Sequence, residues 1–125
     1  MVKKATSLFL ILLLVLSMTG CLRTEGEPIA VAAENFVNLL AEGKYGEAIL
    51  YFDETMKEEL SPGDLRVAWE TLLEKGGNYV GQKYNEVIDF DFHRVILIDG
   101  IFERAQVEFR ITFDEAEQIA GLYIK

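Results

Sequence analysis

The strongest strand pattern in the sequence is Arg104-Ala105-Gln106-Val107-Glu108-Phe109-Arg110-Ile111-Thr112-Phe113. Its apolar side chains, starting at Ala105, alternate with polar ones, starting at Gln106. Successive side chains of a strand point to opposite faces of a sheet. The stretch therefore predicts a β-strand over residues 104–113, with one face against a core and the other face more polar.

Three further segments with a period of two lie on either side of this stretch. Residues 79–90 and 92–102 precede it, and residues 119–125 follow an acidic turn at residues 114–118. Together they predict a meander of four antiparallel strands. Asp99-Gly100 has two interpretations, a two-residue hairpin turn or a bulge inside a longer second strand. We favour the bulge, because Ile101 and Phe102 then still have a sheet to join.

Before the strands the apolar periodicity is helical. Residues 29–42 carry one apolar stripe, made of Ile29, Ala32, Ala33, Phe36, Val37 and Leu40. Residues 44–60 predict two short helices, the second capped by Asp53. Ser61-Pro62-Gly63-Asp64 is typical of a helix start, and this helix should end at Gly76-Gly77. Helices followed by an antiparallel meander predict an α+β fold, with amino-terminal helices packed on one face of a curved four-stranded antiparallel sheet.

The amino-terminal segment has the pattern of an export signal. Lys3 and Lys4 precede an unbroken apolar run over residues 8–16. That run is short for a transmembrane helix, which needs roughly 20 apolar residues. Small residues, Thr19 and Gly20, then lead to Cys21, the only cysteine. We therefore predict that residues 1–20 are a signal peptide that is removed.

Met18-Thr19-Gly20-Cys21 resembles the lipobox of lipoprotein signal peptides, although Met18 stands where leucine is more common. The resemblance implies that Cys21 carries a diacylglycerol on its sulfur and becomes the first residue. Residues 21–27 would then be the lipidated cysteine and a tether, and residues 28–125 a domain on the extracytoplasmic face of the cell membrane. The alternatives are an uncleaved apolar anchor and a free buried cysteine.

Charge and cysteine usage exclude several classes of function. The chain has a formal net charge of −9, and loss of residues 1–20, which hold two lysines and no acid, leaves −11. Such a domain is repelled by nucleic acid, so we expect no nucleic-acid partner. With Cys21 lipidated, no thiol remains for a disulfide or a cysteine metal site.

A family resemblance rests on the residues around the first helices and on the end of the chain. It is carried by Phe36-Val37-Asn38-Leu39-Leu40-Ala41-Glu42-Gly43-Lys44-Tyr45, Phe52-Asp53, Leu60-Ser61-Pro62, Trp69, Gly76-Gly77, Phe113-Asp114 and Ile119-Ala120-Gly121-Leu122. These resemble a family of small secreted or lipoprotein domains of unknown function. Such domains are similar to the nuclear-transport-factor-2-like, cystatin-like superfamily, which implies a cone with an apolar pocket. The resemblance implies no catalytic residues.

Aromatic residues are the candidates for ligand binding. Trp69, Tyr51 and Tyr79, together with Tyr84, have the apolar surface that lines ligand pockets. Aromatic side chains at helical spacing are more often part of a core, and this interpretation stays open beside the first. Neither interpretation requires a cofactor.

The other polar candidates have ordinary explanations. Glu86, Asp89, Asp91 and His93 cluster near the first predicted hairpin, but they lack the spacing of a calcium loop and read as its solvated face. We therefore predict no metal site there. His93, the only histidine, is expected on the surface.

Three functions remain from the sequence. The leading hypothesis is a non-enzymatic, lipid-anchored domain that binds a partner protein or a small apolar ligand. It requires an exposed apolar patch on the open sheet face or a cavity near Trp69. The alternatives are a small isomerase or dehydratase with a buried acid such as Asp53 or Asp89, and a structural envelope component.

Overall fold

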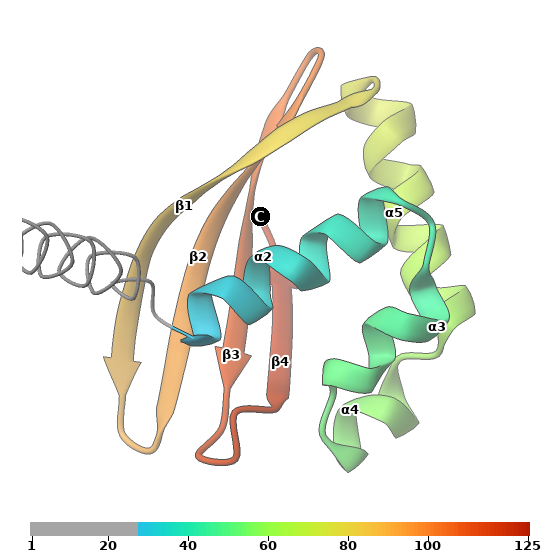
Figure 1. Cartoon of the computed structure of the whole chain (residues 1–125). Coiled ribbons are helices and arrows are strands. Elements are labelled where there is room, and N and C mark those ends of the chain that lie inside the picture. The colour runs from blue at the N-terminus through green and yellow to red at the C-terminus, as the bar shows by residue number, and fades with distance from the viewer. Residues whose placement is uncertain (1–27) are drawn as a thin grey trace, which may run out of the picture.

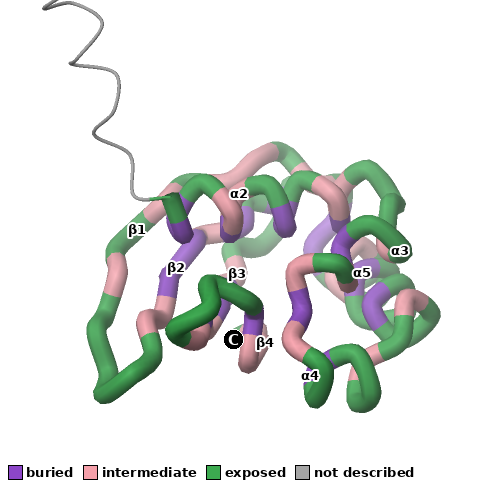
Figure 2. Tube along the Cα trace, turned by 60° about the horizontal axis from the view of Figure 1, so that its bottom comes forward, coloured by how far each residue is buried: buried purple, intermediate pink, exposed green. Residues whose placement is uncertain are grey.

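In the computed structural model, which describes residues 28–125, the chain begins with helix α2 (Pro28–Ala41). This helix crosses one face of the sheet (Figure 1), and the residues coloured as buried along it lie on its side toward the strands (Figure 2). They include the predicted stripe residues Ile29, Ala33, Phe36 and Leu40. The apolar periodicity of residues 29–42 was therefore a correct guide to the inner face of the first helix. Cys21 and the signal segment lie outside the described residues.

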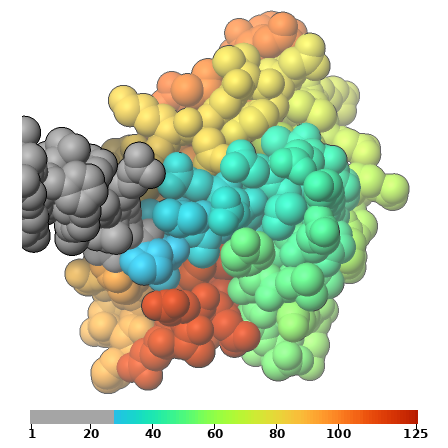
Figure 3. Space-filling model, viewed as in Figure 1, coloured from blue at the N-terminus to red at the C-terminus, as the bar shows by residue number. Residues whose placement is uncertain are grey.

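The segment after α2 folds into three short helices and one helix of 15 residues, which lie beside the sheet (Figure 1). They are α3 (Tyr45–Ala48), the 3₁₀ helix η2 (Ile49–Tyr51), α4 (Glu54–Glu59) and α5 (Pro62–Gly76). Asp53 caps α4 as predicted, because its side chain accepts a hydrogen bond of 2.8 Å from the backbone N–H of Met56. In Figure 3, α2 spans the front of the molecule, and the turn before the last strand borders it.

The sheet is an antiparallel meander in which sequence neighbours are also neighbours in space. Its strands are β1 (Tyr79–Phe90), β2 (His93–Phe102), β3 (Gln106–Phe113) and β4 (Ile119–Ile124), in the order β1-β2-β3-β4. Together with the preceding helices, the sheet confirms the predicted α+β class. In Figure 1, β1 bends across the molecule toward the end of α5, which gives the sheet its curvature.

Two details of the strand prediction are wrong. Asp99-Gly100 is neither a hairpin turn nor a bulge, because both residues are regularly paired with β1 and with β3. The register shifts instead lie in β1, between Tyr79 and Gly81 and between Tyr84 and Glu86. The third strand begins at Gln106 rather than Arg104, since a tight turn closes with the Phe102 N–H bonded to the Ala105 carbonyl at 2.8 Å.

Helices and sheet share one hydrophobic core within the described part of the chain. Its largest fully buried side chains include Phe36, Phe52, Phe109 and Phe113, which come from both layers. A parallel bridge between Phe52 and Ile119, with the Asp53 N–H bonded to the Ile119 carbonyl at 2.9 Å, joins the helical segment to β4. Residues 28–125 thus have a core of their own, at a size at which domains fold independently.

We expect Ser61→Ala to lower the free energy of unfolding by about 1 kcal/mol, the usual effect of losing a helix cap. Ser61 and Asp64 form a capping box at the start of α5. The Asp64 N–H donates to the Ser61 hydroxyl (3.1 Å), and the Ser61 N–H donates to the Asp64 carboxylate (2.9 Å). Urea unfolding measures the change. Ser61→Thr is the control, because it keeps the hydroxyl; equal losses in both variants would contradict the cap.

Candidate functional site

An apolar cavity lies between the end of α2, the α4–α5 region and β4. Its volume is about 240 Å³. It is lined by Leu40, Leu60, Asp64, Leu65, Ala68, Trp69, Leu122, Tyr123 and Ile124. Seven of these nine side chains are aliphatic or indole, and such apolar lining with few polar groups is typical of small-molecule sites.

β4 is the edge strand of the sheet, so its outer side faces helices rather than another strand. The cavity lies on that side. The bridge at Ile119 draws the helical segment against one end of β4. Farther along the strand, Leu122 and Ile124 are only partly buried and border the cavity. Ala68 is exposed on α5, and its small side chain leaves space beside Trp69.

Trp69 lines the cavity and packs against three other aromatic rings. It is 3% exposed, and its ring lies 5.3 Å from that of Tyr79, 5.5 Å from that of Phe102 and 6.3 Å from that of Phe109. The Phe109 ring is nearly parallel to the indole, at 19°. Three such contacts fix the indole, since aromatic pairs gain energy beyond their buried area.

Tyr79 backs Trp69 and stays neutral. Burial raises the pKa of the Tyr79 hydroxyl above its ordinary value. The hydroxyl oxygen is buried and makes no hydrogen bond to the other described residues. It therefore supports the indole as an uncharged, mostly apolar ring.

Asp64 is the only charged side chain among the residues that line the cavity. The hydrogen bond from the Ser61 backbone N–H is the main cause that lowers the pKa of its carboxyl, and the Ser61 side chain lowers it further. The carboxylate is consequently ionised at neutral pH. A negative group at the rim of an apolar cavity disfavours anionic ligands.

The three aromatic residues predicted to bind a ligand lie at different positions relative to the cavity. Trp69 lines the cavity, and Tyr79 contacts it from behind. The Tyr51 ring packs edge-on against Phe36 at 6.4 Å and is not among the lining residues. Tyr84 is half-buried against the core. Sequence reasoning missed the aliphatic walls and Asp64, because their patterns equally describe core positions and a helix cap.

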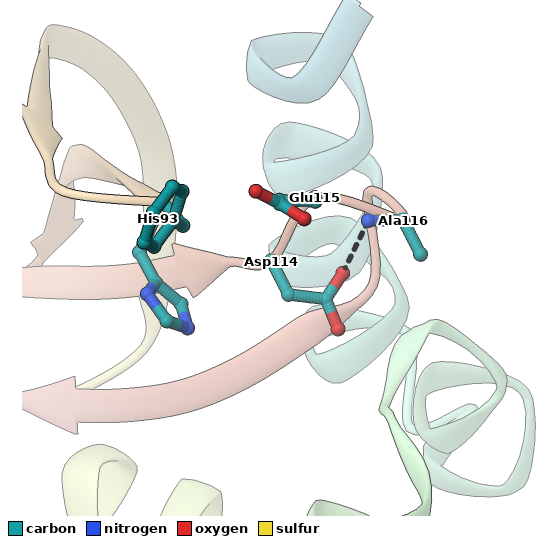
Figure 4. A pocket seen from close by; sticks show the side chains of 5 residues that line it. His93, Asp114, Glu115 and Ala116 are labelled. Carbon is teal, nitrogen blue, oxygen red and sulfur yellow. Dashed lines mark hydrogen bonds between the residues drawn. The ribbon is translucent and has the colours of Figure 1, made fainter.

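The acidic cluster at the β1–β2 hairpin is a solvated surface, as predicted. Asp89 pairs with Arg94, Oδ1 to Nε at 2.9 Å, and both side chains are exposed. Nearby, an open depression is lined by Phe92, His93, Asp114, Glu115 and Ala116 (Figure 4). There the Asp114 carboxylate accepts the Ala116 backbone N–H at 2.9 Å. Among residues 28–125, no three His, Cys, Asp or Glu side chains are arranged to hold a metal ion.

The acids named for an enzymatic alternative have structural roles. Asp53 caps α4, and Asp89 pairs with Arg94. Within the described residues, no charged or polar residue falls in the buried class. The buried catalytic carboxylate that this alternative requires is therefore not found in residues 28–125.

Residues 28–125 contain no helix with the length and apolar character needed to cross a membrane.

Comparison with known proteins identifies a family but no characterised relative. Residues 33–122 match the model of DUF3887, a protein family of unknown function, and this range includes most of the cavity. No curated protein and no solved structure matches the chain. The predicted membership of the nuclear-transport-factor-2-like superfamily stays a prediction. Because the match covers well over half of its residues, the chain belongs to the DUF3887 family.

Proposed function

We propose that the protein is a lipid-anchored, extracytoplasmic domain that binds a small apolar ligand in the cavity beside Trp69. The observation that carries the binding role is the cavity itself, with its seven apolar walls and a fixed indole. The lipobox-like stretch at Cys21 supports the anchoring role, and the folded domain begins soon after it, at Pro28. A purely structural envelope component has no need of such a cavity.

The volume of the cavity limits the size of the ligand. At about 240 Å³, it has the volume of roughly eight liquid waters, taking about 30 Å³ for each. A short alkyl chain or a single ring is of this order. Contact with Leu65 and Ile124 removes the ligand's apolar surface from water, which contributes roughly 25 cal/mol for each Å².

We expect 1-octanol to bind more tightly than octanoate, which has the same chain length. The Asp64 carboxylate repels the carboxylate of octanoate and not the hydroxyl of octanol. Binding is measured as the change in the fluorescence of Trp69, the only tryptophan in the chain. Asp64→Asn should reduce the preference without removing it, because octanoate still loses hydration of its charge on entering an apolar cavity. A preference of the same size in Asp64→Asn and in the native chain contradicts this role of the carboxylate.

Two variants on α5 distinguish binding in the cavity from binding elsewhere. Ala68→Phe places a ring in the cavity from an exposed helix position and should abolish the octanol response. Val67→Phe adds the same ring one position away, where the side chain is 61% exposed and does not line the cavity. It should leave the response unchanged. Failure of the native chain to respond to either probe at their solubility limits contradicts the proposed function.

A further inference from the structure

One end of the sheet brings together the start of α2, the β1–β2 hairpin and the β3–β4 turn (Figure 1). An open groove of about 380 Å³ lies between these three segments. Its lining includes Ile29 from α2, Phe92 from the hairpin and Glu115 from the turn. Residues 28–29, 90–93 and 114–117 are here called the hairpin end. Segments that are far apart in the sequence thus share one small surface.

Two exposed phenylalanine rings stand at the hairpin end. Phe92 is 75% exposed, and Phe90, two residues earlier, is 66% exposed. Phe90 pairs with His93, so Asp91 and Phe92 form a two-residue turn, in which Asp91 adopts a positive φ of 52°. Such turns favour glycine, asparagine and aspartate and do not require an aromatic ring. Since folding alone does not explain these rings, they indicate an interaction surface.

The length of chain before α2 places this surface near the predicted lipid. Cys21 lies seven residues before Pro28. An extended chain spans about 3.4 Å for each residue, so Cys21 is at most roughly 24 Å from the start of α2. The other end of β1 is farther away by the length of the strand. A lipid on Cys21 therefore holds the hairpin end, rather than the opposite end of the sheet, close to the membrane.

The charge of the hairpin end selects among membrane surfaces. Asp91, Glu115 and Glu117 are exposed there, while Asp89 is paired with Arg94, Oδ1 to Nε at 2.9 Å. This end is therefore net negative and is repelled by anionic headgroups. A surface of neutral headgroups imposes no such repulsion and still accepts apolar rings.

We propose that the hairpin end docks on the membrane, with the Phe90 and Phe92 rings among neutral headgroups; this rests on the proposed lipidation of Cys21. Two rings bury little area, but the lipid makes their contact intramolecular and so raises the effective concentration of the surface. The docked domain keeps its cavity away from the bilayer. Leu40, which lines the cavity, lies about 18 Å from Pro28 along α2, at 1.5 Å for each residue.

Tryptophan fluorescence of the lipidated chain tests the proposal, in vesicles of phosphatidylcholine brominated on one acyl chain. Bromine quenches an indole that it contacts. Phe92→Trp should lose roughly half or more of the emission that it adds to that of the native chain, because tryptophan is favoured at the membrane–water interface. The native chain supplies the baseline, since Trp69 is only 3% exposed.

Val80→Trp is the matched control. Val80 is 67% exposed and lies near the other end of β1, about 33 Å along the strand from Phe90 at about 3.3 Å for each residue. Its added emission should be quenched little. Phe90→Ser, combined with Phe92→Trp, should lower the quenching, because it removes the second ring. Circular dichroism checks that each variant is folded.

Flotation of the same vesicles separates docking from anchoring. A chain that floats with the vesicles, but in which Phe92→Trp is quenched no more than Val80→Trp, overturns docking and leaves the anchor in place. A chain that does not float overturns both.

The lipid composition tests the assignment to neutral headgroups. At constant bromine content, adding phosphatidylglycerol should lower the quenching of Phe92→Trp at low salt, and added salt should restore it by screening the repulsion. Stronger quenching on the anionic vesicles overturns this assignment.

Discussion

Gly100→Ala is expected to destabilise the domain by about 3 kcal/mol, the upper end of the usual range for overpacking. A Cβ atom at Gly100 would clash with Cε2 of the Phe109 ring and would lie 3.2 Å from Cγ2 of Val107. The Phe109 ring cannot move away easily, because it is fully buried and stacks on Trp69 at 6.3 Å. Either the ring or the backbone of β2 must shift, and both are part of the core.

Gly81→Ala is the matched control for this prediction. Gly81 also lies in a strand, but a Cβ atom there has no neighbour within 4 Å. Its effect should be small, because it adds no clash and alanine reduces the freedom of the unfolded chain. Urea unfolding followed by Trp69 fluorescence and by circular dichroism measures both variants. Equal stability of Gly100→Ala and the native chain contradicts tight packing at the centre of the sheet.

The same glycine explains where sequence reasoning failed in the sheet. Asp99-Gly100 has the composition of a turn or bulge, and local chemistry supports both interpretations. In the structure, Gly100 lies in a regular strand because a ring from the next strand covers its backbone. The reason for the glycine is thus a contact with Phe109, nine residues along the chain. A single sequence does not reveal such a contact, and the bulges in β1 depend on the partner strand in the same way.

Features determined by local chemistry were predicted well. The alternation around Phe109 and Ile111 places both in the core, and Asp53 and Ser61 cap helices as expected. Trp69, named from the sequence as a candidate for ligand binding, lines the cavity, and its binding role stays a prediction. The other lining residues were not predicted, because the cavity brings together Leu40 and Leu122, which are far apart in sequence. Whether such leucines touch each other or leave space depends on how the helices rest against β4.

Cys21→Ser is expected to remove the protein from the membrane fraction of a host that lipidates exported cysteines. A serine hydroxyl does not form the thioether that carries the diacylglycerol. Two acyl chains are the minimum for stable anchoring, since one chain gives only marginal, reversible binding. The native chain should partition into the detergent phase of Triton X-114. Its intact mass should correspond to residues 21–125 plus the lipid, and Cys21→Ser should lose this added mass.

Ser17→Ala is the control, because it alters the predicted signal peptide without touching the acceptor, so its product should match the native one in mass and in partitioning. A native chain found in the detergent phase at the full, unmodified mass of residues 1–125 contradicts lipidation. It supports instead an uncleaved anchor formed by the apolar run at residues 8–16. The folded domain should be indifferent to this change, since its core lies within residues 28–125. Unchanged octanol binding by Cys21→Ser therefore separates anchoring from recognition, because lipid attachment and the cavity beside Trp69 depend on different parts of the chain.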